Sequence, residues 1–127
     1  MRGTDPRREK GKEGGGINMN QEDRNSLYLR AIKLWGIEAQ TLMVIEEMAE
    51  LQKALCKFWR SGFRENHSQV VDEIADVEIM LEQLRLILPW SEAVNTAKRQ
   101  KIERLRTRIE LAEKHKGHFQ NKAKEAA

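Results

Sequence analysis

The sequence predicts an all-α protein, an antiparallel bundle of about four helices, and two observations carry this prediction. Apolar residues recur every three or four positions from residue 20 to residue 114, and no stretch alternates between apolar and polar residues as a strand does. The 127 residues are 39% apolar and 34% charged and include only two prolines, which suits helices around a limited core. Because a chain this short buries a small share of its surface, we expect dimerisation to complete the bundle.

Residues that stop helices separate the predicted elements. Gly36 ends the first helix, Gly62 follows the second, and Pro89 stops the third, because glycine suits the position after a helix and proline cannot continue one. Ser91 then suits the start of a fourth helix, which continues to about residue 114. The expected helices cover residues 20–35, 37–60, 69–88 and 91–114.

Both ends of the chain fall outside this helical domain of residues 20–114. Residues 1–19 are rich in glycine and charge and predict a disordered leader, and residues 115–127 predict a flexible polar tail. No apolar run reaches the roughly 18 residues of a membrane span, and no apolar segment of a secretory signal follows the first charges. The single cysteine, Cys56, cannot form an internal disulfide, so we expect a cytoplasmic protein without membrane contact.

The charges are distributed unevenly along the chain. The net charge is +3, but residues 17–97 carry 8 basic and 13 acidic residues, whereas residues 98–127 carry ten basic and four acidic residues. A basic protein raises the expectation of nucleic-acid binding. Here the centre of the predicted fold is acidic, so the sequence does not favour nucleic acid as a partner.

Carboxylates interrupt the apolar arcs of the second and third helices. At about 100° per residue, Glu47 falls inside the arc of its helix and Glu50 on its margin. Glu73 likewise falls inside the arc of the third helix, with Asp76 on its rim. The residues expected to form the core stripes of these two helices are Val44, Met48, Leu51, Leu55, Ile74, Val77, Leu81 and Leu84.

The four acids are placed to converge. Glu47 and Glu50 are three residues apart and share a face, as do Glu73 and Asp76. Antiparallel packing of two helices joined by a short turn lets the two pairs face each other. Because unpaired buried carboxylates are costly and repel one another, a hard cation, Mg²⁺ or Mn²⁺, is the expected partner. The alternative is that these are ordinary acidic pairs on solvated helices, with Lys53 and Lys57 neutralising Glu50 and Glu46.

The acidic residues also carry a resemblance. "EEMAE" (46–50) is followed after 22 residues by "EIAD" (73–76), and this E-E-x-x-E…E-x-x-D pattern resembles the MazG-like family of all-α nucleoside triphosphate pyrophosphohydrolases over residues 24–112. The resemblance implies Mg²⁺ bound by Glu47, Glu50, Glu73 and Asp76. It also implies hydrolysis of an NTP or dNTP between the α and β phosphates, and a homodimer or homotetramer.

Basic and aromatic residues are candidates for the rest of such a site. Of the acids, Glu50 or Glu47 would take the proton of the attacking water.

The candidates for binding the phosphates are Lys53, Lys57, Arg60, Lys98 and Lys101. Trp35 and Gln40 are candidates for holding the base, because a ring stacks on it and an amide reads its edge. The alternatives are that the lysines are ordinary surface residues and that the tryptophan packs in the core.

Two other functions are compatible with the sequence. A phosphoribosyl-ATP pyrophosphohydrolase uses the same arrangement of acids with a different substrate. A helical module without enzymatic activity would instead bind nucleic acid through the basic ends of the chain.

Overall fold

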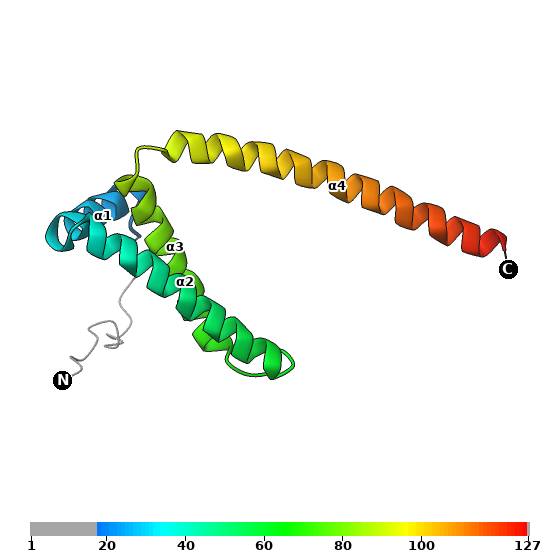
Figure 1. Ribbon diagram of the computed structural model, residues 1–127, viewed down its shortest axis with the longest axis horizontal. Coiled ribbons are helices and arrows are strands. Elements are labelled where there is room, and N and C mark those ends of the chain that lie inside the picture. Colours follow the sequence, from blue (N-terminus) through cyan, green and yellow to red (C-terminus); the bar gives the residue numbers. More distant parts are fainter. Residues whose placement is uncertain (1–17, 127) are drawn as a thin grey trace.

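This computed structural model describes residues 18–126, which form four helices joined by short connections (Figure 1). They are α1 (Gln21–Trp35), α2 (Ile37–Arg60), α3 (His67–Ile87) and α4 (Ser91–Glu125). No strand occurs between residues 18 and 126, so the predicted all-α class with four helices is confirmed. None of these helices is both long and apolar enough to cross a bilayer. The predicted leader, residues 1–19, lies almost entirely outside the described residues.

Helices α2 and α3 form an antiparallel hairpin, which makes the largest helix–helix contact in the molecule (Figure 1). The turn between them begins at Gly62, whose φ of 69° lies in the left-handed region that glycine adopts without strain. Phe63 also has a positive φ of 63°, and its ring packs edge-on against Phe58 at 5.1 Å between centroids. The Asn66 side chain closes the turn by donating a hydrogen bond of 3.1 Å to the carbonyl oxygen of Ala54.

A single residue, Gly36, joins α1 to α2. Its φ of 93° lies in the region that favours glycine, and its amide donates a 2.8 Å hydrogen bond to the carbonyl oxygen of Ile32. At the other end of α1, the Asn20 side chain accepts a 2.8 Å hydrogen bond from the amide of Asp23 and caps the helix. The sharp change of direction at Gly36 places α1 across the α2–α3 hairpin.

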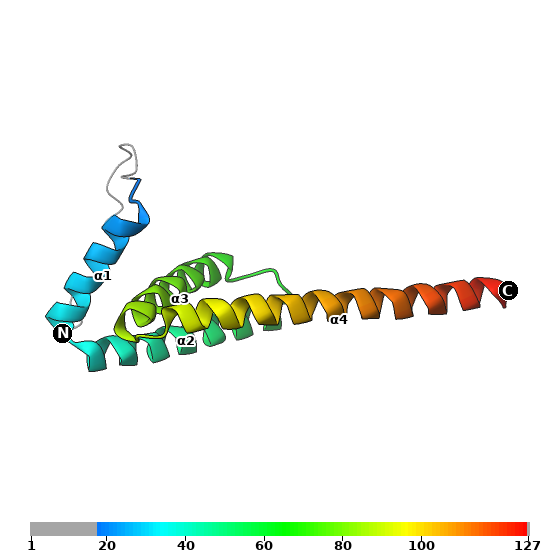
Figure 2. The same ribbon diagram turned by 90° about the horizontal axis from the view of Figure 1, so that it is seen from above.

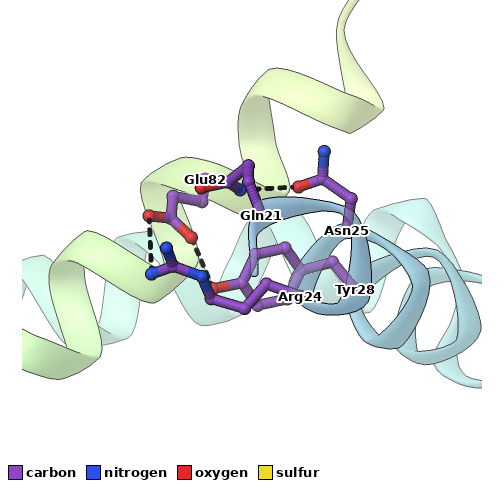
Figure 3. A network of polar contacts seen from close by, with 5 residues as sticks. All are labelled: Gln21, Arg24, Asn25, Tyr28 and Glu82. Carbon is purple, nitrogen blue, oxygen red and sulfur yellow. Dashed lines mark hydrogen bonds and ion pairs between the residues drawn. The ribbon is translucent and has the colours of Figure 1, made fainter. Parts of the chain in front are cut away.

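Polar contacts fasten α1 to α3 (Figure 3). The buried Tyr28 hydroxyl donates a hydrogen bond to one carboxylate oxygen of Glu82, and the Arg24 guanidinium lies 4.0 Å from the other. Gln21 donates a 2.8 Å hydrogen bond to Asn25 along the same helix. Burial, together with the hydrogen bond and charge of Glu82, raises the pKa of Tyr28 to about 12.

The core is small and is rotated away from the predicted stripes. Among the described residues, the buried apolar side chains are Tyr28, Val44, Ala54 and Met80, and the buried polar ones are Gln40, Glu73 and Gln83. Val44 is thus the only member of the predicted stripes that is fully buried. Met48, Leu55, Ile74 and Leu81 are instead 45%, 44%, 42% and 41% exposed, so the prediction was wrong for these four residues. Helices α2 and α3 therefore pack through the sides that carry the acids, and these four apolar residues stay exposed.

Helix α4 leaves the other three helices at its first turns. The Arg85 guanidinium donates a 2.6 Å hydrogen bond to Asn95 and so anchors the start of α4 to the end of α3. The rest of α4 extends past the ends of α2 and α3 (Figures 1 and 2), and no residue of this helix is buried. It continues beyond Lys114, where we expected it to end, to Glu125, because no proline follows and only Gly117 disfavours the helix.

Candidate metal centre

Three carboxylates from α2 and α3 meet in the middle of the hairpin. Glu47 of α2 and Glu73 and Asp76 of α3 each offer one oxygen, and these oxygens lie within 4.8 Å of one another. Glu73 is buried, whereas Glu47 and Asp76 are half-buried. The spacing of the two motif halves on antiparallel helices brings these acids together, as the sequence predicted.

Glu73 has one carboxylate oxygen without a hydrogen-bond partner. Its side chain is 7% exposed, and Oε1 accepts a 2.6 Å hydrogen bond from the Gln69 amide. Oε2 is buried and accepts no hydrogen bond. Since the Gln69 amide is neutral, it brings no positive charge to the carboxylate. A buried charge left in this state is destabilising by several kcal/mol, on the order found for uncompensated buried ions.

The donor set fits a hard divalent cation. All three side chains offer oxygen, the ligand atom that Mg²⁺ and Mn²⁺ prefer. Ligand oxygens at about 2.1 Å from Mg²⁺ lie about 3 to 4 Å from each other, so closing the group by about 1 Å would suffice. A cation here would give Glu73 Oε2 the partner it lacks and remove the repulsion among Glu47, Glu73 and Asp76.

Glu50, the fourth predicted ligand, lies outside this group of three. It is exposed on α2, one turn beyond Glu47. There it borders a small hollow of about 150 Å³ together with Lys53, Lys57 and Gln69. This position is next to the centre and open to water, so it suits a proton acceptor at the rim.

An apolar pocket adjoins the carboxylates on the side toward α1. Its volume is about 760 Å³, and Glu47 and Asp76 form part of its wall. Trp35 and Gln40, both predicted to hold a base, also line it. The other lining residues are Ala39, Leu42, Met43, Glu46, Ile79, Met80 and Gln83. A mostly apolar pocket of this size with carboxylates at one end has the character of a small-molecule site.

Gln40 also contacts a residue of α3 that the sequence did not predict as part of the site. Its buried amide donates a 2.7 Å hydrogen bond to Oε1 of Gln83, which ties α2 to α3 beneath the pocket. Gln83 follows Asp76 by seven residues, so it lies on the same face of α3. Gln69 precedes Glu73 by four residues and supports it from the same face. Both glutamines could have been found by extending the faces of the acids along α3.

Basic residues of α2 lie on the other side of the carboxylates from the apolar pocket. Lys53 and Lys57 border the hollow that contains Glu50. Lys57 also borders a second hollow of about 430 Å³, together with Arg60 and Asn66 at the turn. The three predicted phosphate-binding residues of α2 therefore follow the acids in the direction away from the apolar pocket.

Lys98 and Lys101 lie elsewhere. Both are exposed on α4. Lys98 borders a hollow at the junction of α3 and α4, with Leu81 and Trp90, and neither lysine lines the pockets beside the carboxylates. Their contact with phosphates stays a prediction.

No protein-family model, no curated protein and no solved structure matches this chain. What the chain shows is an all-α protein of four helices with an acidic group able to hold a metal ion.

Proposed function

We propose that this protein is a Mg²⁺-dependent nucleoside triphosphate pyrophosphohydrolase of the MazG-like kind. The observation that carries the proposal is the group of Glu47, Glu73 and Asp76, in which a buried carboxylate oxygen has no partner. The E-E-x-x-E…E-x-x-D pattern supplies these same three residues. The structure supports the proposal further through what lies on each side of the acids.

The apolar pocket, the acidic group and the basic residues follow one another along α2 in the order in which a nucleotide carries its base and its phosphates. Along α2, the apolar pocket at Gln40 comes first, the acid Glu47 follows, and the basic residues begin at Lys53. With a rise of 1.5 Å per residue, Gln40 lies about 10 Å before Glu47 and Lys57 about 15 Å beyond it. A nucleoside in the pocket would direct its phosphates across the acids toward Lys53 and Lys57.

The chain's own residues would each have a defined role in hydrolysis. Glu47, Glu73 and Asp76 would hold Mg²⁺, which, when bound, neutralises phosphate oxygens and makes phosphorus more electrophilic. Lys53, Lys57 and Arg60 would bind the oxygens of the leaving pyrophosphate and offset its charge. These three basic residues are spaced to share one face of α2, so they would reach the same end of the substrate.

Glu50 is the residue we assign as proton acceptor. It is exposed one turn beyond Glu47 and outside the group of three, which leaves its carboxylate available to water. The water oxygen would form a bond to phosphorus of the α–β anhydride as the bridging P–O bond breaks. Glu50 would take the proton, and the products would be a nucleoside monophosphate and pyrophosphate.

A panel of NTPs and dNTPs, together with phosphoribosyl-ATP, tests the activity. Each substrate is incubated with and without Mg²⁺, and the products are separated by ion-exchange chromatography. We expect Mg²⁺-dependent monophosphate and pyrophosphate from at least one nucleotide. Orthophosphate as the first product, or no turnover of any substrate, would contradict the proposal.

A pair of matched variants connects the activity to the site. Glu73→Gln should abolish hydrolysis, since it removes the buried charge with little change of shape. Glu78→Gln is the control, because Glu78 is exposed on α3 and lies outside the acidic group. Equal turnover by the two variants would remove Glu73 from the site.

A further inference from the structure

Two glutamine side chains meet in the wall of the apolar pocket beside the carboxylates. Gln40 of α2 and Gln83 of α3 are 5% and 6% exposed, and both line this pocket. The Gln40 amide donates a 2.7 Å hydrogen bond to Oε1 of Gln83. Because a side-chain amide has both an NH₂ donor and a carbonyl acceptor, this one bond leaves half of each amide unused.

The unused half of each amide is open to a ligand. Within residues 18–126, neither glutamine makes a hydrogen bond besides the one that they share. Among these same residues, the only sealed polar side-chain atom without a partner is Oε2 of Glu73. Oε1 of Gln40 and Nε2 of Gln83 are therefore accessible from the pocket that both residues line, where they offer an acceptor beside a donor.

The glutamine pair lies about one nucleoside away from the acidic group. Gln40 precedes Glu47 by seven residues, which is two turns or about 10 Å along α2. Gln83 follows Asp76 by the same number of residues on α3. Because the two helices are antiparallel, both displacements point in the same direction. A nucleotide with its phosphates at the acids would bring the edge of its base to the two amides.

The edges of the bases present two hydrogen-bond patterns. Cytosine and adenine carry an amino group beside a ring nitrogen that accepts, whereas uracil and hypoxanthine carry a carbonyl oxygen beside a ring N–H that donates. The free acceptor of Gln40 and the free donor of Gln83 match the amino pattern. If both amides turn by 180°, Gln83 donates the shared bond, and the free donor of Gln40 and acceptor of Gln83 match the carbonyl pattern.

No third group holds the two amides in one of these orientations. The shared bond is the only hydrogen bond that either amide makes within the described part of the chain. The carboxylates in the pocket wall lie at its other end, and the nearest along α2 is Glu46, six residues from Gln40. A joint turn therefore keeps the shared bond and breaks no other.

We propose that the Gln40–Gln83 pair reads the base of the substrate, and that the two amides turn together to accept an amino edge or a carbonyl edge in the same place. This inference rests on the proposed function, because it assigns the base-reading element of that site. In both orientations the exocyclic group of the base faces one glutamine and the ring nitrogen faces the other, so the nucleotide keeps its position. Gln83 is thereby a specificity-determining residue, together with Gln40.

Calorimetric titration of the native protein with CMP, UMP, AMP and IMP tests the proposal. Mg²⁺ is present throughout, and monophosphates have no α–β bond to hydrolyse. We expect CMP and UMP to bind within about threefold of each other, and AMP and IMP likewise, because each edge forms the same number of hydrogen bonds. A preference above about tenfold within either pair, or no binding of any of the four, would overturn the proposal.

Two variants fix the pair in opposite senses. Gln40→Glu and Gln83→Glu each introduce a carboxylate, which only accepts hydrogen bonds. The carboxylate that faces the exocyclic group should favour the amino bases, and the one that faces the ring nitrogen should favour the bases with a ring N–H. We expect the ratio of CMP to UMP affinity to change at least about tenfold, in opposite directions in the two variants.

The opposite signs separate base reading from a general effect of charge. Both variants add the same charge to the same pocket, so charge alone would shift the ratio in one direction. Gln52→Glu is the control, since Gln52 is exposed on α2 outside the pocket lining and should keep the native ratio. Shifts of equal sign, or ratios equal to that of the control, would overturn the proposal. The ratio compares two ligands on one sample, so partial unfolding of a variant does not change it.

The outcome for base reading is distinguishable from the outcome for hydrolysis. Turnover of nucleoside triphosphates without this binding pattern would overturn the role of the glutamine pair and leave the hydrolase. The binding pattern without turnover of any triphosphate would contradict the hydrolase and support the glutamine pair as the base-reading element of a nucleotide site.

Discussion

Glu73 and Gln69 lie one turn apart on α3, and the Gln69 amide donates a 2.6 Å hydrogen bond to Oε1 of Glu73. This contact orients the carboxylate while its other oxygen stays buried without a hydrogen bond. Oε2 of Glu73 is therefore held in a fixed position in which it can bind a cation. The helix holds the carboxylate in place at a cost in stability that a bound cation would offset.

The stability of the protein should therefore depend on divalent cation through Glu73. Mg²⁺ at about 100 times its dissociation constant should stabilise the native protein by about 2.7 kcal/mol, read as a rise in melting temperature. Glu73→Gln should raise the melting temperature of the cation-free protein by several degrees, since about 1 kcal/mol corresponds to about 4 to 8 °C in a domain of this size. The same variant should no longer respond to Mg²⁺, whereas Glu78→Gln should respond as the native protein does.

Lys53 and Lys57 should act on substrate binding. Because both line the hollow beyond the carboxylates, Lys53→Ala and Lys57→Ala should each raise KM about tenfold, equivalent to about 1.4 kcal/mol. Lys114→Ala, on the exposed distal part of α4, is the control for loss of one positive charge. Steady-state kinetics at fixed Mg²⁺ measure the three variants, and a KM shared by all of them would exclude a local role for the α2 lysines.

Trp35 should contribute to binding of the nucleoside but not of the phosphates. Its ring lines the apolar pocket, so Trp35→Ala should weaken binding of a nucleoside monophosphate about fivefold to tenfold. Trp35→Phe keeps an aromatic face and should recover most of that loss. Calorimetric titration with the monophosphate, and with tripolyphosphate as the ligand without a base, separates the two contributions. Weaker binding of both ligands would indicate damage to the fold.

The contact between Tyr28 and Glu82 should make stability fall at high pH. Burial and the Glu82 carboxylate raise the pKa of folded Tyr28 from 10.0 to about 12, so the folded state favours the neutral phenol. This stabilisation is complete below about pH 10 and is lost as the pH rises toward about 12. Tyr28→Phe should cost about 1 to 2 kcal/mol at neutral pH, through loss of the hydrogen bond.

Urea denaturation of the native protein and Tyr28→Phe across this pH range checks the prediction. The difference in unfolding free energy between the two proteins should be constant at neutral pH and should shrink above about pH 10. A difference that stays constant up to about pH 12 would show that the hydroxyl of Tyr28 does not titrate in this way.

The acidic group and the ends of three helices could be predicted because short-range signals determine them. Gly36 and Pro89 stop helices through their own backbone properties, and Glu47, Glu73 and Asp76 are placed by spacing on two antiparallel helices. Such features need no knowledge of the rest of the fold.

The buried line of each helix could not be predicted in the same way. Periodicity shows that Leu55 and Leu81 lie on an apolar side, but it does not show which neighbour covers that side. In this chain the hairpin buries Gln40 and Gln83 instead, where the Gln40 amide donates a hydrogen bond to the side-chain oxygen of Gln83 between the helices. Apolar lines that a partner would cover have the same sequence pattern as a chain's own core.

Gly36 has a mechanical consequence for how a ligand enters. Trp35 is the last residue of α1 and forms one wall of the apolar pocket, while α2, which carries Glu47, begins immediately after Gly36. With only Gly36 between the two helices, the backbone at Trp35 can move relative to α2 only if the whole of α1 turns, and the Tyr28–Glu82 contact resists that rotation. The backbone on this side of the pocket is therefore held in place, and the exposed Trp35 side chain changes the width of the entrance only through its own rotamers.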